Sequence, residues 1–402
     1  MAGPRASAFD VDEVRGRFPS LQSGFAFLDA PGGTQVPEEV VEAVATAQRV
    51  ASGNLGAPYE TSERVGAILA DAEAAAARFL GAQPHQVCFG ANMSSVNFSL
   101  SRAAGREFSA GDEILVSALD HDAGVAPWVE LAHDLGLTVR TVDIHPDTTL
   151  DLDDLESKLG ERTRVVAFAW AANACGTVVD AARVVELAHS AGALAWVDAV
   201  HYSAHEPIDF ASLGADVLLC SAYKWCGPHV GIGIVDERVA ESWRPYKVRP
   251  SASDPFARRF NTGTQAYELL AGVTAAIEYL EGLGGMPGLR DYEHELGARF
   301  LAGLPDSVTV YGRPDMEQRV PTFLFSIDGV PSPEAAAQLA ARGYGVWSHD
   351  TYYALGLYPR LGYDEALRLG FIHYNTEAEV DGVLAAIHDL ARGVSDGSVH
   401  PG

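Results

Sequence analysis

Lys224 ends an apolar, strand-like run, residues 217–224, and it is one of three lysines in this chain of 402 residues. At the end of a buried strand an ammonium group loses its water, so its pKa falls and its amine becomes a usable nucleophile or Schiff-base former. Lysine is seldom fully buried, and the alternative is a side chain that follows apolar surface out to solvent. Other residues of the sequence, Asp198 first among them, favour a role for Lys224 as a nucleophile or Schiff-base former.

An acidic residue, Asp198, follows a second apolar run, residues 194–197. Burying a carboxylate there is costly unless it meets a cation. The ring nitrogen of pyridoxal phosphate is such a cation, and proteins hold this cofactor with a lysine Schiff base and a carboxylate on the ring nitrogen. His201, which comes soon after Asp198, could donate a hydrogen bond to the phenolate oxygen of the same ring.

A third segment suited to this cofactor is residues 90–95, which follow a strand-like run and open a helix-like one. The amides at a helix N-terminus carry partial positive charge and, together with the Ser94 hydroxyl, would bind a phosphate group. Taken alone, the segment is better explained as an ordinary serine N-cap. The phosphate-binding interpretation is favoured because the segment occurs in the same chain as Asp198 and Lys224 and precedes them.

The composition is that of a globular protein, with 48% hydrophobic and 20% charged residues. A formal net charge of −26, spread along the chain, disfavours binding to nucleic acid or to an anionic membrane. The N-terminal residues show no apolar signal segment, and no stretch approaches the roughly 18 apolar residues that span a bilayer. Four cysteines without CxxC spacing favour a reducing compartment and disfavour a metal site, so we expect a cytoplasmic protein.

Short apolar runs alternate with helix-like segments through residue 235. This order predicts a mostly parallel sheet flanked by helices, with ligands at the carboxyl ends of the strands. The predicted strands are residues 86–89, 113–117, 164–169, 194–197, 217–220 and 231–235, and the predicted helices include 180–190, 267–283 and 376–392. After about residue 265 the pattern favours helix over strand, which predicts a second, α+β domain.

Five motifs occur in order along the chain: Asp120-His121-Asp122 with Ala126-Pro127-Trp128, Asn173-Ala174-Cys175-Gly176-Thr177, Asp198-Ala199-Val200-His201, Ser221-Ala222-Tyr223-Lys224 and Asn261-Thr262-Gly263-Thr264. Together they resemble the motifs of fold-type I, pyridoxal-phosphate-dependent enzymes of the class V aminotransferase family, nearest the cysteine-desulfurase-like branch. The resemblance runs from about Phe27 to residues 373–376. It implies an α/β fold whose large domain, residues 22–265, has a mainly parallel seven-stranded sheet. Residues 1–21 and 266–402 would form the smaller α+β domain.

The resemblance also implies a role for each residue of the cofactor site. Lys224 would form the Schiff base, Asp198 would pair with the ring nitrogen, and His121 would stack on the ring face. Asn173 and His201 would hold the phenolate oxygen, with His201 standing where desulfurases usually have glutamine. The phosphate would be bound by residues at the helix start and in the lysine motif, and by one residue from the second subunit of a homodimer: Met93, Ser94, Ser221 and Thr264.

Arg368, in a stretch that looks helical, would bind the substrate carboxylate through its planar guanidinium, and Asn173 would lie beside that substrate. Cysteine desulfurases carry a nucleophilic cysteine on a loop upstream of this arginine. The corresponding region here, residues 346–355, contains no cysteine. Because persulfide chemistry needs that thiolate, the sequence argues against a true desulfurase unless Cys175 or Cys226 lies near the cofactor.

The chemistry that remains best supported is β-elimination, by a C–S β-lyase that acts on an S-substituted L-cysteine and uses Lys224 as the proton shuttle. An aromatic pocket would suit a bulky thiol conjugate from secondary metabolism, such as antibiotic biosynthesis. Its expected lining is Tyr59, Trp347, His349, Tyr352 and Tyr353. Packing between the two domains explains these aromatic residues equally well.

Several alternatives stay open on the sequence alone. Enzymes of lincosamide-type biosynthesis that resemble this chain process cysteine conjugates by elimination or by decarboxylation coupled to oxidative deamination, and transamination and epimerisation need the same residues. A non-catalytic cofactor-binding accessory protein would not retain Lys224, Asp198, His121 and Arg368 together. A nicotinamide-dependent dehydrogenase would need a GxGxxG turn after an early strand, which residues 90–95 lack.

Overall fold

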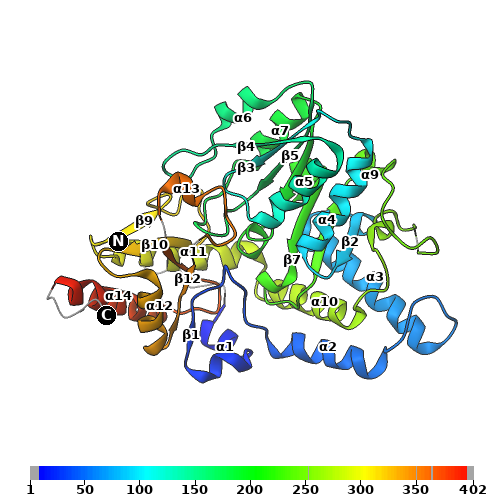
Figure 1. The fold of residues 1–402 in the computed structure, drawn as a ribbon. Helices are drawn as coiled ribbons and strands as arrows, with labels where there is room; N and C mark the ends of the chain where they lie inside the picture. Colours follow the sequence, from blue (N-terminus) through cyan, green and yellow to red (C-terminus); the bar gives the residue numbers. More distant parts are fainter. Residues whose placement is uncertain (1–8, 252, 350, 364, 396–402) are drawn as a thin grey trace.

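The computed structural model describes residues 9–251, 253–349, 351–363 and 365–395, and its largest element is a seven-stranded sheet (Figure 1). The strands follow the order β2-β8-β7-β6-β5-β3-β4, and all are parallel except β8, which runs antiparallel to both neighbours. Their bounds are β2 Val87–Gly90, β3 Glu113–Ser117, β4 Thr138–Val142, β5 Thr163–Ala169, β6 Leu194–Asp198, β7 Val217–Ser221 and β8 Gly231–Val235. The predicted mainly parallel sheet is confirmed.

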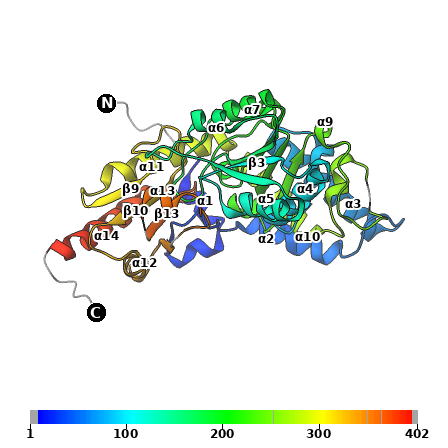
Figure 2. The ribbon, with the colours of Figure 1, turned by 45° about the horizontal axis from the view of Figure 1, so that its top comes forward.

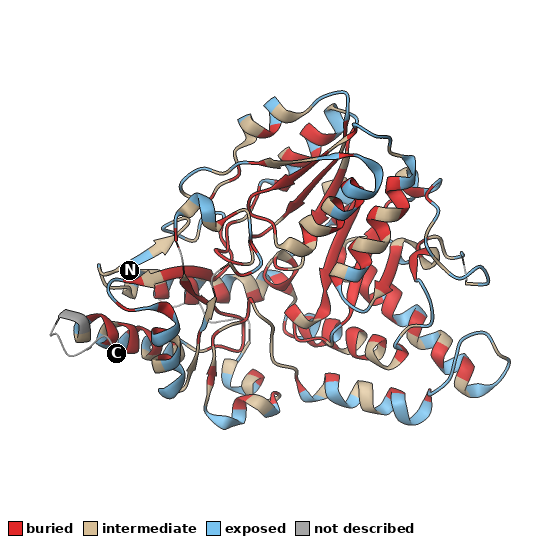
Figure 3. Ribbon diagram, viewed as in Figure 1, coloured by how far each residue is buried: buried red, intermediate tan, exposed pale blue. Residues whose placement is uncertain are grey.

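Helices cover both faces of this sheet because its strands are apolar on both sides, as in other parallel sheets. On one face the α5 residue Trp128 packs edge-on against Trp196 of β6, with 4.9 Å between ring centroids. On the other face Val184 of α7 and Val273 of α10 share a core with Val197. The central strands of the sheet are red with burial in Figure 3, whereas the edge strand β4 is mostly tan and pale blue. The covering helices are α3 Glu60–Leu80, α4 Met93–Ala104, α5 Asp122–Leu135, α7 Ala181–Ser190 and α10 Tyr267–Gly282, with α2 Glu38–Val50 packed on α10.

A second, antiparallel sheet lies at the other end of the molecule, as Figure 2 shows in yellow to red. Its strand order is β12-β13-β10-β9, and its core contains Phe300, Phe323, Phe325 and Phe371. The strands are β9 Val308–Tyr311, β10 Thr322–Ile327, β12 Trp347–His349 and β13 Ala366–Gly370, and the helices beside them are α11 Met286–Gly303, α12 Ser332–Ala341 and α14 Glu377–Ser395. This sheet matches the predicted smaller α+β part of the chain.

The division of the chain into domains stays a prediction. Near each predicted boundary, one segment packs against or pairs with the part of the chain assigned to the other domain. Helix α10, which follows the boundary at 265/266, packs against α2 and α3. Near the other boundary, β1 (Ala26–Phe27) pairs in parallel with β11 (Tyr344–Gly345), so the N-terminal segment lies along the C-terminal part. The remaining short helices are α1 Val11–Gly16, α6 Leu152–Lys158, α8 Phe210–Leu213, α9 Glu237–Ala240 and α13 Tyr358–Leu361.

Two sequence-based expectations need correction. Arg368 does not lie in a helix but in β13, where it pairs with Leu324 of β10. The edge strand β4 was not predicted, because three of its five residues, TVRTV, are polar and no apolar run marks it. Among the described helices, none has the length and apolar character needed to cross a membrane.

Candidate cofactor site

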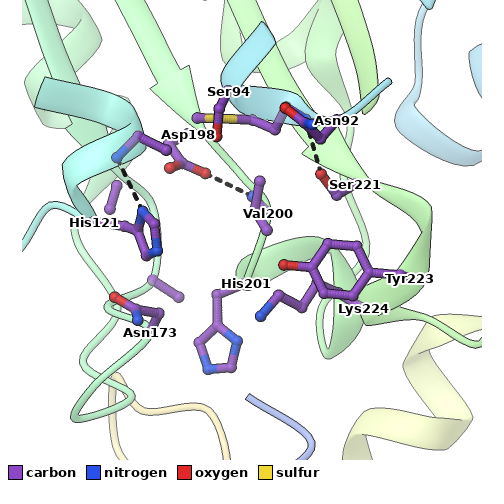
Figure 4. Close-up of a pocket in the computed structure, with 14 residues that line it drawn as sticks. Asn92, Ser94, His121, Asn173, Asp198, Val200, His201, Ser221, Tyr223 and Lys224 are labelled. Carbon is purple, nitrogen blue, oxygen red and sulfur yellow. Dashed lines mark hydrogen bonds between the residues drawn. The ribbon is translucent and has the colours of Figure 1, made fainter. Parts of the chain in front are cut away.

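A hollow of about 530 Å³ lies at the carboxyl ends of the large-sheet strands, where parallel sheets bind ligands. Asp198 ends β6, Ser221 ends β7, and Lys224 closes the short 3-10 turn that follows β7. Figure 4 shows Lys224 and Tyr223 on one side of the hollow and His121 and Asn173 on the other. The lining residues are Asn92, Met93, Ser94, His121, Ala123, Ala169, Ala171, Asn173, Asp198, Val200, His201, Ser221, Tyr223 and Lys224.

Lys224 is 7% exposed, and its ammonium nitrogen donates a hydrogen bond to the backbone carbonyl of Pro31. Burial, assisted by the positive charge of Arg368, lowers the pKa of Lys224 to about 7, although the carboxylates of Asp29 and Asp198 oppose the shift. A large share of the amine is therefore unprotonated near neutral pH. That state is the one a lysine needs to attack a carbonyl or to accept a proton.

Asp198 is a buried carboxyl, and its Oδ1 accepts the backbone N–H of Val200 at 2.9 Å. Burial raises the pKa of Asp198 to about 6, since no permanent cation among the described residues pairs with it directly. A ligand with a cationic ring nitrogen would lower this pKa and gain an ionic hydrogen bond in return. Asp198 is thus well placed for its predicted partner.

An anion-binding cup lies at the N-terminus of α4. Asn92 is the N-cap, and its side chain accepts the backbone N–H of Ser95 at 2.9 Å. The backbone N–H of Met93 donates to the Ser221 hydroxyl at 3.2 Å, which joins the helix start to the end of β7. A side chain at Gly231 would lie 2.2 Å from the Asn92 backbone, so only glycine lets β8 approach this cup. The N-terminal amides of a twelve-residue helix suit a phosphate group.

His121 faces the cup from the N-cap of α5. Its Nδ1 accepts the backbone N–H of Ala123 at 3.0 Å, which leaves Nε2 to carry the proton of the neutral ring. Burial, with further help from Lys224 and Arg368, lowers the pKa of His121 to about 4. A neutral, flat ring in this position suits the predicted stacking on an aromatic cofactor.

Two buried polar atoms in the lining residues have no hydrogen-bond partner within the described part of the chain: His201 Nδ1 and Asn173 Oδ1. The other His201 nitrogen, Nε2, is 2.9 Å from the Thr322 hydroxyl. Asn173 donates its amide N–H to the Tyr352 carbonyl at 3.0 Å. Unpaired polar atoms are costly to bury, so their presence indicates a polar ligand. His201 can donate to a phenolate oxygen, whereas Asn173 offers a ligand an acceptor.

The loop that follows β12 folds over the mouth of the pocket. Tyr353 stacks on His121, with 5.3 Å between ring centroids, and its carbonyl accepts the Asp122 backbone N–H at 2.7 Å. His349 also stacks on Tyr353, with 5.8 Å between centroids. Tyr352 and Tyr353 both have left-handed backbone angles, with φ of 51° and 58°, which non-glycine residues adopt only when their surroundings hold them there.

The structure separates the five aromatic residues predicted to line a substrate pocket. Tyr353, which stacks on His121, is 55% exposed, whereas Trp347 is 40% exposed and borders a separate hollow with Asp29. The His349 ring contacts the rings of both. Tyr352 has a buried ring that is not part of the lining, and its hydroxyl donates to the carbonyl of Ala366 at 2.7 Å, so its role in substrate binding stays a prediction. Tyr59 is exposed at the start of α3 and is not part of the lining.

Arg368 is buried in β13 beside the pocket rather than in its lining. Its Nε donates to Asp29 Oδ1 at 3.1 Å, and its Nη1 donates to the Asn173 carbonyl at 3.3 Å. The guanidinium carbon lies 4.9 Å from the centre of the Trp347 ring and 4.6 Å from that of Tyr352. The predicted role of Arg368 in carboxylate binding stays a prediction.

Among the residues with polar or ring contacts to Lys224 and Arg368, the sequence did not predict Asp29, Pro31 and Tyr223. Tyr223 lines the hollow, and its ring centre is 4.9 Å from the Lys224 nitrogen. Its position next to Lys224 was a usable signal. Asp29 and Pro31 belong to a turn whose sequence gives no hint that it meets Lys224 or Arg368, because those contacts join distant parts of the chain.

Behind His201 a buried chain of polar side chains leads into the C-terminal part. The His205 ring meets the His201 ring edge-on, with 5.1 Å between centroids. Glu293 of α11 lies 2.6 Å from His205 Nδ1 and accepts the backbone N–H of His373 at 2.9 Å. The Tyr279 hydroxyl lies 2.8 Å from His373 Nε2. Burial alone would raise the pKa of Glu293, but His205 and His373 outweigh it and hold the pKa below its usual range.

The pocket residues fit pyridoxal phosphate. Lys224 would hold it covalently, Asp198 would meet its ring nitrogen, and the cup at Met93 and Ser94 would meet its phosphate. The unpartnered His201 Nδ1 supplies a donor for its phenolate oxygen. Thr264 does not line this pocket but borders a separate hollow with Gly90 and Ala91.

Comparisons with known proteins agree with this site. Residues 26–383 match the sequence profile of the family described as aminotransferase class-V. The chain is 30% identical to the aminotransferase-like protein FGM3 of Gibberella zeae, over 95% of this chain and 98% of that protein. It is 30% identical to the probable cysteine desulfurase 2 of Mycobacterium leprae, over 94% and 96%. A cysteine desulfurase structure from Thermococcus onnurineus superposes with a TM-score of 0.90 at 25% identity, covering 98% of this chain and 100% of that one. This chain therefore belongs to the class V aminotransferase family and is a fold-type I, pyridoxal 5′-phosphate-dependent enzyme.

Proposed function

We propose that this enzyme is a C–S β-lyase acting on an S-substituted L-cysteine. The observation that carries the proposal is the loop over the pocket mouth, which brings Tyr353 onto His121 and contains no cysteine. All four cysteines of the chain are buried, and none is among the residues that line the pocket. Burial raises the pKa of the thiols of Cys88, Cys220 and Cys226. A buried thiol kept protonated is a poor nucleophile, which speaks against persulfide chemistry.

The residues of the pocket can divide the work of β-elimination between them. When bound, pyridoxal phosphate draws electrons from the bonds to the α-carbon of an attached amino acid. Lys224 Nζ, with a pKa of about 7, takes the α-proton and holds it in the pocket. The Cβ–S bond then breaks, and sulfur leaves with the electron pair and is released as a thiol. One water hydrolyses the remaining enamine, so the other products are pyruvate and ammonia.

The mouth of the pocket supports a bulky sulfur substituent. Tyr353, on the His121 ring, exposes 55% of its surface, and Trp347, beside the Arg368 guanidinium, exposes 40%. Exposed aromatic rings offer apolar surface to the sulfur substituent of a substrate. That substituent could therefore extend outside the hollow that holds the cofactor. Conjugates of secondary metabolism, including those of antibiotic biosynthesis, are substrates of this shape.

The proposal is tested by incubating the enzyme with S-benzyl-L-cysteine, S-methyl-L-cysteine and free L-cysteine. We expect equal amounts of thiol and pyruvate from the S-benzyl compound, and little alanine or bound sulfur from L-cysteine. Carbon dioxide with an aldehyde and peroxide would instead indicate decarboxylation coupled to oxidative deamination, and a keto acid that keeps its sulfur would indicate transamination. Alanine and a persulfide would contradict the proposal and direct attention to Cys175 and Cys226.

Arg368 is the residue we propose for binding the substrate carboxylate. Arg368→Lys keeps the positive charge but loses the paired N–H groups, so substrate affinity should fall by about 1–3 kcal/mol, the size of hydrogen bonds to a charged group. The Michaelis constants of the variant and of the exposed control Arg299→Lys on α11 give the comparison. Unchanged kinetics in Arg368→Lys would place the carboxylate elsewhere.

We also propose that the enzyme works as a homodimer and lies in the cytoplasm. Thr264 is predicted to bind phosphate across the subunit interface, and its position outside the pocket of its own subunit supports that role. The four free cysteines suit a reducing compartment. Light scattering at micromolar concentration should give twice the chain mass of 42.7 kDa. A monomer that retains the cofactor would contradict the dimer.

A further inference from the structure

One turn of the N-terminal segment touches both cationic side chains beside the pocket. Gly32 and Gly33 donate their backbone N–H groups to the Asp29 carbonyl at 3.0 and 3.3 Å, which closes the turn after β1. Its Pro31 carbonyl accepts a hydrogen bond from Lys224, and its Asp29 carboxylate accepts from Arg368. The turn therefore lies beside the site, and its Asp29 carboxylate places a negative charge next to Arg368.

The pairing of Asp29 with Arg368 uses two points of contact. Nε of Arg368 donates to Oδ1 at 3.1 Å, and Nη2 donates to Oδ2 at 3.4 Å. The Arg368 side chain is 2% exposed and that of Asp29 is 25% exposed. A methyl group at Gly32 would lie 2.0 Å from Asp29 Oδ2, so the contact depends on the absence of a side chain there. Glycine at position 32 thus lets the carboxylate reach the guanidinium.

Groups other than Asp29 also hold the guanidinium in place. The rings of Trp347 and Tyr352 have their centres 4.9 and 4.6 Å from its central carbon, and the Asn173 carbonyl accepts from Nη1. What Asp29 adds is charge: it offsets the positive charge that an incoming carboxylate would otherwise meet. The positive charge of Lys224 also acts on Asp29, and Lys224 in turn is influenced by the carboxylates of Asp29 and Asp198.

A displaced Asp29 side chain also has somewhere to go. It borders a second hollow, shared with Gly32, Gly33, Gln35 and Trp347. Burial raises the pKa of Asp29, and although Arg368 and Lys224 oppose the shift, the net direction is upward. Because burial disfavours the charged form of Asp29 and a hollow lies beside it, a substrate carboxylate can displace the Asp29 carboxylate from Arg368.

We propose that Asp29 is a specificity-determining residue that competes with the substrate carboxylate for Arg368, and so weakens the preference of the site for amino acids over the corresponding amines. The inference rests on the proposed role of Arg368 in substrate binding. It concerns binding only, and it holds for any reaction that begins with an amino acid in this pocket.

The test compares two ligands that have no leaving group on the β-carbon, L-homophenylalanine and 3-phenylpropylamine. Their dissociation constants are measured on the cofactor-loaded enzyme from the change in cofactor absorbance. In Asp29→Asn we expect L-homophenylalanine to bind about tenfold more tightly or better, because the variant removes a charged competitor for the guanidinium, while the amine changes by less than about twofold. Asp71→Asn, at an exposed position of α3, is the matched control and should change neither constant.

A second variant guards against a change that is particular to asparagine. In Gly32→Ala the added methyl group would lie 2.0 Å from Asp29 Oδ2 and 3.3 Å from Arg368 Nη2, so the carboxylate is the group that must move most. The amino acid should therefore gain affinity over the amine in the same direction. An unchanged ratio of the two constants in Asp29→Asn, or weaker binding of L-homophenylalanine, would overturn the inference. Failure of the lyase proposal appears separately, as an absence of thiol from S-benzyl-L-cysteine in the wild-type enzyme.

Discussion

Lys224→Ala is expected to lose about 10⁴-fold in turnover or more, the upper range for removing a positioned proton-transfer group. Of the three lysines, only Lys224 lines the pocket, whereas Lys158 donates to the Thr141 carbonyl and Lys247 to that of Ser251. Reduction of the wild-type enzyme with borohydride and peptide mapping should place the cofactor on the peptide that contains Lys224. Lys247→Ala serves as the control with full activity. A cofactor bound to Lys158 or Lys247 would refute the assignment.

The pKa of Lys224 gives the same prediction a pH dependence. Because the pKa is lowered to about 7, covalent uptake of the cofactor by apoenzyme should be half-maximal near pH 7, far below the range of an exposed lysine near 10.4. Between these values the unfolded chain binds more protons at this residue than the folded chain. Stability of the apoenzyme should therefore rise with pH through that window, as far as Lys224 contributes. Uptake that requires pH of about 10 would contradict the burial of the amine.

Glu293→Ala is expected to lower the free energy of unfolding by about 3–5 kcal/mol, because the buried groups that hydrogen-bond to this carboxylate lose a charged partner. Glu293 is fully buried and holds His205 and the backbone of His373, so its loss leaves both groups without that partner. Urea unfolding of the cofactor-loaded enzyme measures the change. Glu295→Ala, exposed on the same helix, is the matched control.

The sign of the pH dependence follows from the lowered pKa of Glu293. Its contribution to stability is present above the pKa of an unfolded glutamate, about 4.3, and is lost as the pH falls through the lower folded value. The difference between wild type and Glu293→Ala should therefore shrink in strong acid. If Glu293→Ala unfolds with the same midpoint and slope as wild type at neutral pH, the buried cluster does not stabilise the fold.

The sequence predicted the part of the site that lies at the ends of single strands. Asp198, Ser221 and Lys224 each follow an apolar run, and the strand pattern alone places them at one edge of the sheet. The start of α4 was recognisable for the same reason. The six predicted strands agree with β2, β3, β5, β6, β7 and β8 to within one residue at each end. They could be located because strands buried on both faces are continuous apolar runs.

What could not be predicted depends on contacts between distant segments. Asp29 reaches Arg368 only because β1 lies along β11 and the turn at Gly32 has no side chain in the way. Arg368 looked helical because its neighbours in β13 are buried on both faces, which removes the alternation that marks a strand. The burial of Tyr352 could not be predicted either, because it depends on the hydrogen bond from its hydroxyl to the Ala366 carbonyl of β13, which is distant in the sequence.

The attachment of the mouth loop through its backbone has a consequence for altering the enzyme. The loop is held by the carbonyls of Tyr352 and Tyr353, which accept from Asn173 and Asp122, while Tyr353 itself is more than half exposed. If Tyr353 contacts the substrate as proposed, we expect single substitutions at position 353 to change the substrate range without disturbing these backbone contacts. Its φ of 58° restricts the useful library, since glycine and asparagine accept that angle readily and valine and isoleucine do not.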